Sequence, residues 1–126
     1  MDPTSTAINA AALKACDRIR GHKMLTKAIE RDFAKIGSQE GSEDPIAVAK
    51  WFDACSRWTW YATEYDPETG ICFGYVISGL GSDCDEWGYF SVVEIGTIRN
   101  SMGLPIERDC YREPGTFKGV RELKHQ

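Results

Sequence analysis

The best candidates for catalytic side chains in this chain are carboxylates, because histidine, the usual base for a serine or cysteine nucleophile, is scarce. The 126 residues include two histidines, His22 beside a helix end and His125 near the C-terminus. Activation of a nucleophile requires an imidazole within hydrogen-bond reach of it. Nucleophilic catalysis is therefore disfavoured, and we predict neither a catalytic residue nor a cofactor.

Glu64 is the carboxylate with the most suggestive neighbours. Strand alternation over RWTWYATEYD puts Glu64 on the same face as Trp58 and Trp60. Partial burial beside aromatic rings favours the protonated acid and suits acid–base work. One hypothesis is therefore a ligand or catalytic site in a cleft beside the sheet, formed by Glu64, Arg108 and Asp109, with Glu86 approaching from a neighbouring strand. The simpler interpretation is that Glu64 pairs with Arg108 or faces solvent.

The middle of the chain is strongly acidic. Between Arg57 and Arg99 there is no Lys, Arg or His, and this stretch holds the carboxylates Glu64, Asp66, Glu68, Asp83, Asp85, Glu86 and Glu94. The spacing of Asp83, Asp85 and Glu86 does not match a calcium loop, so we predict a solvated acidic loop and no metal site.

Aromatic residues are frequent in the predicted sheet. Among them are Trp51, Trp58, Trp60, Tyr61, Tyr65, Trp87 and Tyr89. They form either a core beneath helices or an exposed patch that anchors a partner. The predicted partner-binding surface combines carboxylates and rings: Glu64, Asp66, Asp83, Asp85, Glu86, Trp87 and Tyr89. Its carboxylates could stand where the phosphates of a nucleic acid would sit.

The N-terminal part of the chain has the opposite charge. Lys27, Arg31 and Lys35 recur at i+4 spacing along one side of a predicted helix. They are the alternative nucleic-acid contact, together with the helix before them. The net charge of −4 and the pI of about 5.2 argue against general nucleic-acid binding.

Composition indicates one globular domain, with 42% hydrophobic and 27% charged residues. No apolar run approaches the roughly 18 residues of a membrane span, and the N-terminus lacks the pattern of a signal peptide, so we expect a cytoplasmic protein. The five cysteines are odd in number and form no CxxC pair. We expect reduced, mostly buried thiols rather than disulfides or zinc ligands.

Periodicity and turn residues predict an α+β fold with an antiparallel sheet of about four strands and helices against it. Helices are expected over about 5–20, from a Thr26 cap to Gly37, from Ser91 to Gly103, and over 117–123. Strands are expected over 46–53, 57–66, 71–78 and 87–91, with an edge strand over 104–111. The turn at 66–70 joins the second and third strands into a hairpin.

Four sequence segments occur in a characteristic order: MLTKAI at 24–29, WTWYATEYDPETGICFGYV at 58–76, WGYFS at 87–91 and GLPIERD at 103–109. With them the chain resembles a bacterial domain-of-unknown-function family numbered 2958. The resemblance covers about residues 24–123. It implies that 1–23 is an added segment and that the loop at 79–86 is longer than usual. Family members are associated with plasmids and phages, which implies a role in the contest with host defences.

The sequence thus predicts an N-terminal helical extension, 1–23, and a single α+β domain, 24–126. The leading hypothesis is a non-enzymatic interaction protein of a mobile element or phage, which acts as an accessory or anti-defence factor. It would bind a host protein through the acidic and aromatic surface. The small-ligand site around Glu64 and the nucleic-acid module stay as alternatives.

Overall fold

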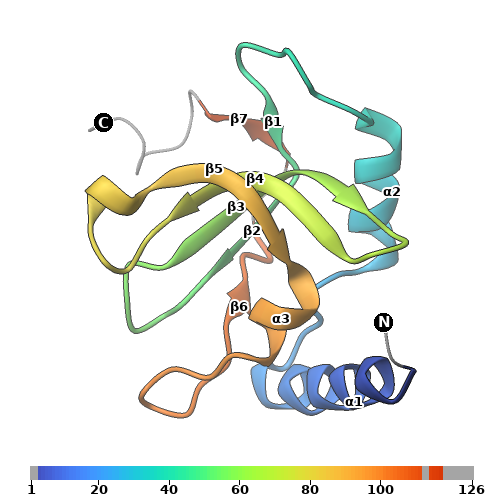
Figure 1. Cartoon of the computed structure of the whole chain (residues 1–126), viewed down its shortest axis with the longest axis vertical. Coiled ribbons are helices and arrows are strands. Elements are labelled where there is room, and N and C mark those ends of the chain that lie inside the picture. The colour runs from blue at the N-terminus through green and yellow to red at the C-terminus, as the bar shows by residue number, and fades with distance from the viewer. Residues whose placement is uncertain (1–2, 112–113, 118–126) are drawn as a thin grey trace.

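The computed structural model describes residues 3–111 and 114–117 and confirms the α+β class. Five antiparallel strands form the main sheet in the order β5-β4-β3-β2-β6, and β1 pairs with β7 in a separate ribbon (Figure 1). The helices are α1 (Pro3–Arg20), α2 (Lys27–Ile36) and α3 (Val92–Thr97), with a 3₁₀ turn, η1 (Ser82–Cys84). The strands are β1 (Ile46–Ala47), β2 (Ala49–Phe52), β3 (Thr59–Asp66), β4 (Ile71–Ile77), β5 (Glu86–Ser91), β6 (Glu107–Arg108) and β7 (Gly115–Thr116).

The predicted cap and turn signals hold at most element ends. The Thr26 hydroxyl accepts a hydrogen bond from the Ile29 amide at 3.2 Å, and Gly37 ends α2 at φ 70°. The hairpin turn closes with Gly70, whose N–H donates to the Asp66 carbonyl at 2.8 Å. At the start of α3, the Ser91 hydroxyl accepts from the Glu94 amide, as the capping signal predicts.

The helix predicted to run from Ser91 to Gly103 is too long. α3 ends at Thr97, and Ile98 is already extended with ψ 140°. The Asn100 side chain accepts hydrogen bonds from the amides of Met102 and Leu104, so it stabilises a turn that competes with helix. The edge strand at 104–111 is also shorter than predicted, and the helix predicted at 117–123 lies outside the described residues apart from Phe117.

A β-bulge in β3 changes which side chains face which way. Ala62 pairs with Gly74, but Glu64 pairs with Phe73, so Thr63 is the extra residue. The predicted alternation is therefore wrong beyond Ala62. Glu64 lies on the opposite face from Trp60, while Tyr65 joins the face that packs beneath α2.

Gly74 makes this bulge possible. A Cβ atom at position 74 would lie 1.7 Å from the Tyr61 carbonyl oxygen and 2.9 Å from the Cα of Ala62. Only a residue without a side chain allows the two backbones to approach so closely.

The sheet has a core on each face. Beneath the helices, Trp51, Trp60 and Ala62 pack with Phe33 of α2 and Ile95 of α3. On the other face the buried cluster is smaller and consists of Ala47, Tyr61, Tyr75 and Ile77, with Phe117 against it. The β1–β7 ribbon lies on this second side and covers part of it (Figure 1).

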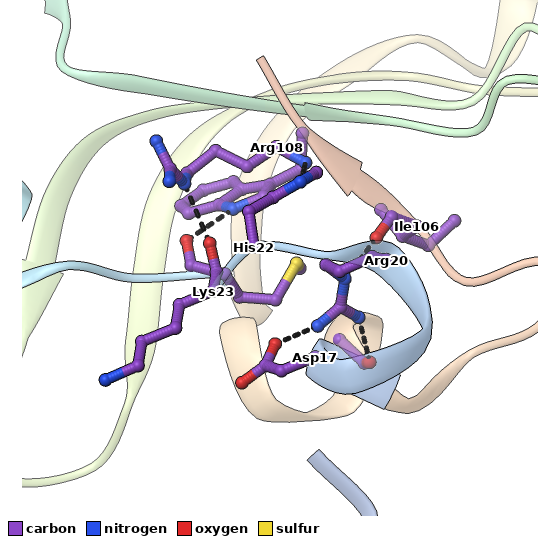
Figure 2. A network of polar contacts seen from close by, with 9 residues as sticks. Asp17, Arg20, His22, Lys23, Ile106 and Arg108 are labelled. Atoms are coloured by element: carbon purple, nitrogen blue, oxygen red, sulfur yellow. Dashed lines mark hydrogen bonds and ion pairs between the residues drawn. The ribbon is translucent and has the colours of Figure 1, made fainter. Parts of the chain in front are cut away.

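Arg20 fastens α1 to the domain through a buried guanidinium, with its side chain 0% exposed. Its Nε donates to the Ile106 carbonyl at 2.8 Å, and its terminal nitrogens bind the Gly96 carbonyl and the Asp17 carboxylate (Figure 2). A buried cation is tolerated only when its donors are satisfied, as they are here. α1 is thus joined to α3 and to the chain before β6 by directed contacts as well as by packing.

The segment after α1 is held by a second set of bonds. His22 Nε2 accepts from the Arg108 amide at 3.1 Å, and Arg108 Nε donates to the Lys23 carbonyl at 2.8 Å (Figure 2). The Trp51 indole N–H donates to the Met24 carbonyl at 2.8 Å. Burial, together with the charges of Arg108 and Arg20, lowers the pKa of His22 from 6.5.

The cysteines are less buried than predicted. All five are free, but only Cys16 and Cys72 are buried, whereas Cys55, Cys84 and Cys110 are exposed. Burial raises the pKa of the Cys72 thiol to about 12, which keeps it protonated and inert. None of the helices in the described ranges has the length and hydropathy of a membrane span.

Gly74→Ala is expected to lower the free energy of unfolding by about 3 kcal/mol, because the added methyl overlaps backbone atoms that cannot move independently. Gly88→Ala is the matched control, since Gly88 pairs with Gly74 and a Cβ there meets nothing within 4 Å. Urea unfolding measures both. Equal stability of the Gly74 variant and the native chain would contradict the role of Gly74 in the bulge.

The stability of the domain should also depend on the protonation of His22. Folding lowers the pKa of His22, so as the pH decreases the unfolded chain binds the proton before the folded chain does. The contribution of His22 to the free energy of unfolding is therefore present above pH 6.5 and is lost as the pH decreases below that value. His22→Gln keeps an acceptor for the Arg108 amide but does not titrate. Thermal unfolding between about pH 5 and about pH 7.5 should show the native chain losing more stability than this variant. Parallel curves for the two proteins would rule out the effect.

Candidate functional site

A groove of about 850 Å³ lies on the sheet face that carries β1 and β7. Its floor is the end of the sheet nearest the β3–β4 turn, and its wall is the loop between α2 and β1. The lining residues are Gln39, Glu40, Gly41, Ser42, Glu43, Pro45, Thr63, Glu64, Tyr65, Asp66, Thr69, Ile71, Phe73, Trp87 and Tyr89.

Gln39 holds the wall of the groove in place. Its amide nitrogen donates to the carbonyl oxygens of Ile46 and Thr63, each at 2.8 Å, and its amide oxygen accepts from the Ile46 N–H at 2.6 Å. Thr63 in turn donates from its hydroxyl to the Phe73 carbonyl at 3.1 Å. One side chain thus ties the wall to the bulge, so the groove is formed before any ligand arrives.

The floor of the groove ends in a row of aromatic rings. Phe73 lies 5.0 Å from Tyr89 and 6.1 Å from Trp87, measured between ring centroids. Trp87 is 44% exposed and Tyr89 is 78% exposed. Large rings on a strand are ordinarily covered, so these two mark a surface suited to contact with another molecule.

The groove carries negative charge without a balancing cation. Glu40, Glu43, Glu64 and Asp66 line it, and no Lys, Arg or His is among its described lining residues. Glu64 is half-buried, and within the described part of the chain no side chain forms a hydrogen bond or ion pair with it. Four carboxylates at one site create a local field that favours a cation.

The structure brings together part of the predicted partner-binding surface. Glu64, Asp66, Trp87 and Tyr89 meet in the groove. The remaining carboxylates of that surface do not. Asp83 is exposed in η1, and Glu86 pairs with Val76 on the face opposite Glu64, so the expected approach of Glu86 to Glu64 is wrong.

Asp85 has a structural role instead of lying in a solvated loop. Its side chain is 1% exposed and binds the Arg57 guanidinium through both oxygens, at 2.8 and 2.7 Å. One oxygen also accepts from the Ser78 amide at 2.7 Å. A bidentate pair of this geometry is among the stronger charge contacts, and it fixes the turn between β4 and β5.

The alternative site of Glu64, Arg108 and Asp109 is not assembled. Arg108 belongs to β6 at the far edge of the sheet, two strands from β3, and lies in a different depression together with Asp109. The bulge also places Glu64 and Arg108 on opposite faces. Only the part of that hypothesis that put Glu64 in a concave site holds.

The predicted basic stripe is present on α2. Lys27, Arg31 and Lys35 are all exposed on the side of the helix away from Phe33. Nucleic-acid contact through these residues stays a prediction. Within the described ranges, no three His, Cys, Asp or Glu side chains converge as metal ligands would.

Sequence reasoning missed the residues that build the groove. Gln39, Glu40 and Glu43 lie in a loop whose position depends on long-range contacts, so no local signal marks them. Gly74 was the available clue, because an isolated glycine within a strand pattern indicates a bulge or a close backbone approach. That clue would have moved Glu64 to the correct face.

The fold and the site together define an α+β domain with an acidic and aromatic groove. A family model described as "Protein of unknown function (DUF2958)" matches residues 22–117, and the chain belongs to this family, as its sequence motifs predicted. No curated protein and no solved structure matches the chain. The match begins at His22, so α1 lies outside it and every residue that lines the groove lies inside it.

Asp85→Asn should lower the midpoint of thermal unfolding by about 5 °C or more, because it weakens the bidentate pair and leaves Arg57 without its counter-charge. Asp83→Asn removes an equal charge from the same loop and should leave the midpoint unchanged. Differential scanning calorimetry distinguishes the two variants. If Asp85→Asn left the midpoint unchanged, the structural role of Asp85 would be refuted and the solvated loop that the sequence predicts would stand.

Proposed function

We propose that this protein is a protein-binding domain whose groove accepts a cationic segment of a partner. The observation that supports this most directly is the combination of four lining carboxylates with two exposed rings and no described lining cation. Arg and Lys side chains satisfy both features, because an ammonium or guanidinium group pairs with carboxylates and also stacks on aromatic faces.

The charge of the groove makes a nucleic-acid ligand unfavourable at this site. Phosphate groups would be repelled by Glu40, Glu43, Glu64 and Asp66. A protein segment with basic side chains is attracted by the same field, which raises the association rate at low salt. Aromatic residues also dominate the binding energy of many protein interfaces, which suits Trp87 and Tyr89 to an anchoring role.

A small cationic molecule is the second candidate, and the dimensions of the groove favour it. A volume of about 850 Å³ falls in the range of ligand pockets. Glu64 would supply the orienting charge there. The anti-defence and mobile-element role stays a prediction that rests on the family resemblance, and a host protein with an exposed basic segment is the partner it would require.

Fluorescence polarisation with a labelled peptide of alternating arginine and threonine tests the proposal. The chain should bind this peptide, and it should not bind the matched peptide in which glutamate replaces arginine. Raising the salt from about 50 to about 500 mM should weaken binding by at least about tenfold, because exposed charges are screened. Glu64→Gln combined with Asp66→Asn should weaken it by about tenfold at low salt.

The control variant combines Asp83→Asn with Glu94→Gln, which removes the same charge at exposed positions outside both the groove and β5. It should bind almost as tightly as the native chain. If both double variants weakened binding equally, binding would depend only on net charge, and the groove would be refuted as the binding site. Binding of free arginine as tight as that of the peptide would favour the small-ligand candidate.

A further inference from the structure

β5 forms one edge of the main sheet, and among the described residues nothing pairs with its outer side. An open edge exposes a row of backbone N–H and C=O groups that can accept another strand. Proteins commonly block such edges with Lys, Pro or a bulge. β5 has the sequence EWGYFS, contains none of these residues, and pairs with β4 in unbroken register.

The hydrogen-bond pattern identifies which backbone groups face outward. The Val92 amide donates to the Gly70 carbonyl at 3.1 Å, immediately beyond the paired residues Ile71 and Ser91. Antiparallel pairs alternate between bonded and non-bonded types. The pairs that contain Phe90 and Gly88 are therefore bonded to β4, whereas the N–H and C=O groups of Trp87 and Tyr89 point away from the sheet.

The same two residues thus present both kinds of contact. Their side chains lie on the groove face, and their backbone groups lie on the free edge. A chain that paired with this edge would place alternate side chains on the groove face, beside these rings. Residues opposite each other in a bonded pair have Cα atoms about 5.5 Å apart, which puts a long side chain within reach of the neighbouring ring.

We propose that the partner binds as an added β-strand on the outer edge of β5, with arginines at alternate positions stacked on Trp87 and Tyr89. The inference rests on the proposed function in taking the groove as a cation site. Backbone bonds to the edge supply affinity, and the rings beside the acidic groove select the side chains. Arginine suits the position better than lysine, because its planar group stacks on a ring and keeps its donors free for carboxylates.

A second copy of this chain fits the edge less well. An antiparallel pairing of β5 with another β5 would put two acidic grooves on the same face of one continuous sheet, with no Lys or Arg in either strand to balance them. Like charges placed side by side are unfavourable. An extended arginine-bearing segment of a different protein has the complementary charge.

Amide hydrogen exchange in the full chain, with and without the arginine–threonine peptide, tests the inference. In the free chain the amides of Gly88 and Phe90 should exchange slowly, and those of Trp87 and Tyr89 quickly. On peptide binding, the Trp87 and Tyr89 amides should become protected by at least about tenfold. Gly88 and Phe90 provide the internal control, because their amides already bond to β4.

Two peptides with N-methyl groups on alternate residues, offset by one position, supply the second measurement. A methyl group removes a backbone donor, so the set that faces β5 should weaken binding by about tenfold and the other set should not. Replacing arginine by lysine should weaken binding severalfold. Native mass spectrometry establishes that the complex holds one copy of each chain.

The outcomes separate this inference from the proposed function. Binding without new protection of Trp87 and Tyr89, or with equal effects from the two N-methylated peptides, would overturn strand addition and leave the cation groove standing. Absence of binding to the unmodified peptide would refute both. Protection that increases with protein concentration alone would assign the edge to a second copy and overturn the inference.

Discussion

The extra residue in β3 is the constraint on which the arrangement of this domain depends. Thr63 interrupts the pairing with β4, Gly74 leaves room for the displaced backbone, and Gln39 donates to the Thr63 carbonyl from the wall of the groove. Before the bulge, β3 sends Trp60 and Ala62 into the core beneath the helices. After it, Tyr65 takes over that role and Glu64 faces the other side. A strand of regular alternation would bury the carboxylate and expose the tyrosine, so the bulge positions both core and site.

The two faces of the sheet therefore differ: one is packed beneath the helices, and the other is partly exposed. The helix side buries Trp51 and Phe33 and receives the α1 contacts through Arg20 and Leu13. Gly96 allows this approach, since a Cβ there would lie 2.5 Å from the Leu13 side chain. The opposite face is covered by the β1–β7 ribbon only in part, and the groove lies on its uncovered part. α1 precedes the family match and packs on the helix side, on the face of the sheet opposite the groove.

Local signals in the sequence were sufficient for most elements. Thr26 and Gly37 delimit α2, Gly70 closes the hairpin, and the aromatic density of 58–76 marks β3 and β4. The site was predicted only in part. Asp66, Trp87 and Tyr89 could be identified from the sequence of single strands, whereas the groove forms only when the strands pair and the loop at 39–45 packs against them. The face of Glu64, the burial of Asp85 and the position of Gln39 each depend on residues at least seven positions away. Alternation counted along one strand cannot detect a shift that its neighbour imposes.

The four carboxylates and the exposed Tyr89 ring of the groove contribute little to folding, so stability does not explain why they lie there. An exposed tyrosine ring and a carboxylate without a described partner add almost nothing to stability, and four like charges in one site oppose it slightly. Elsewhere in the chain, buried charges form hydrogen bonds and ion pairs, as the contacts of Arg20 and Asp85 show. Unsatisfied charge therefore sits where a pre-formed groove meets an unprotected strand edge. A domain built only for stability would neutralise the carboxylates and block the edge, whereas a domain that binds a basic strand requires both to stay open.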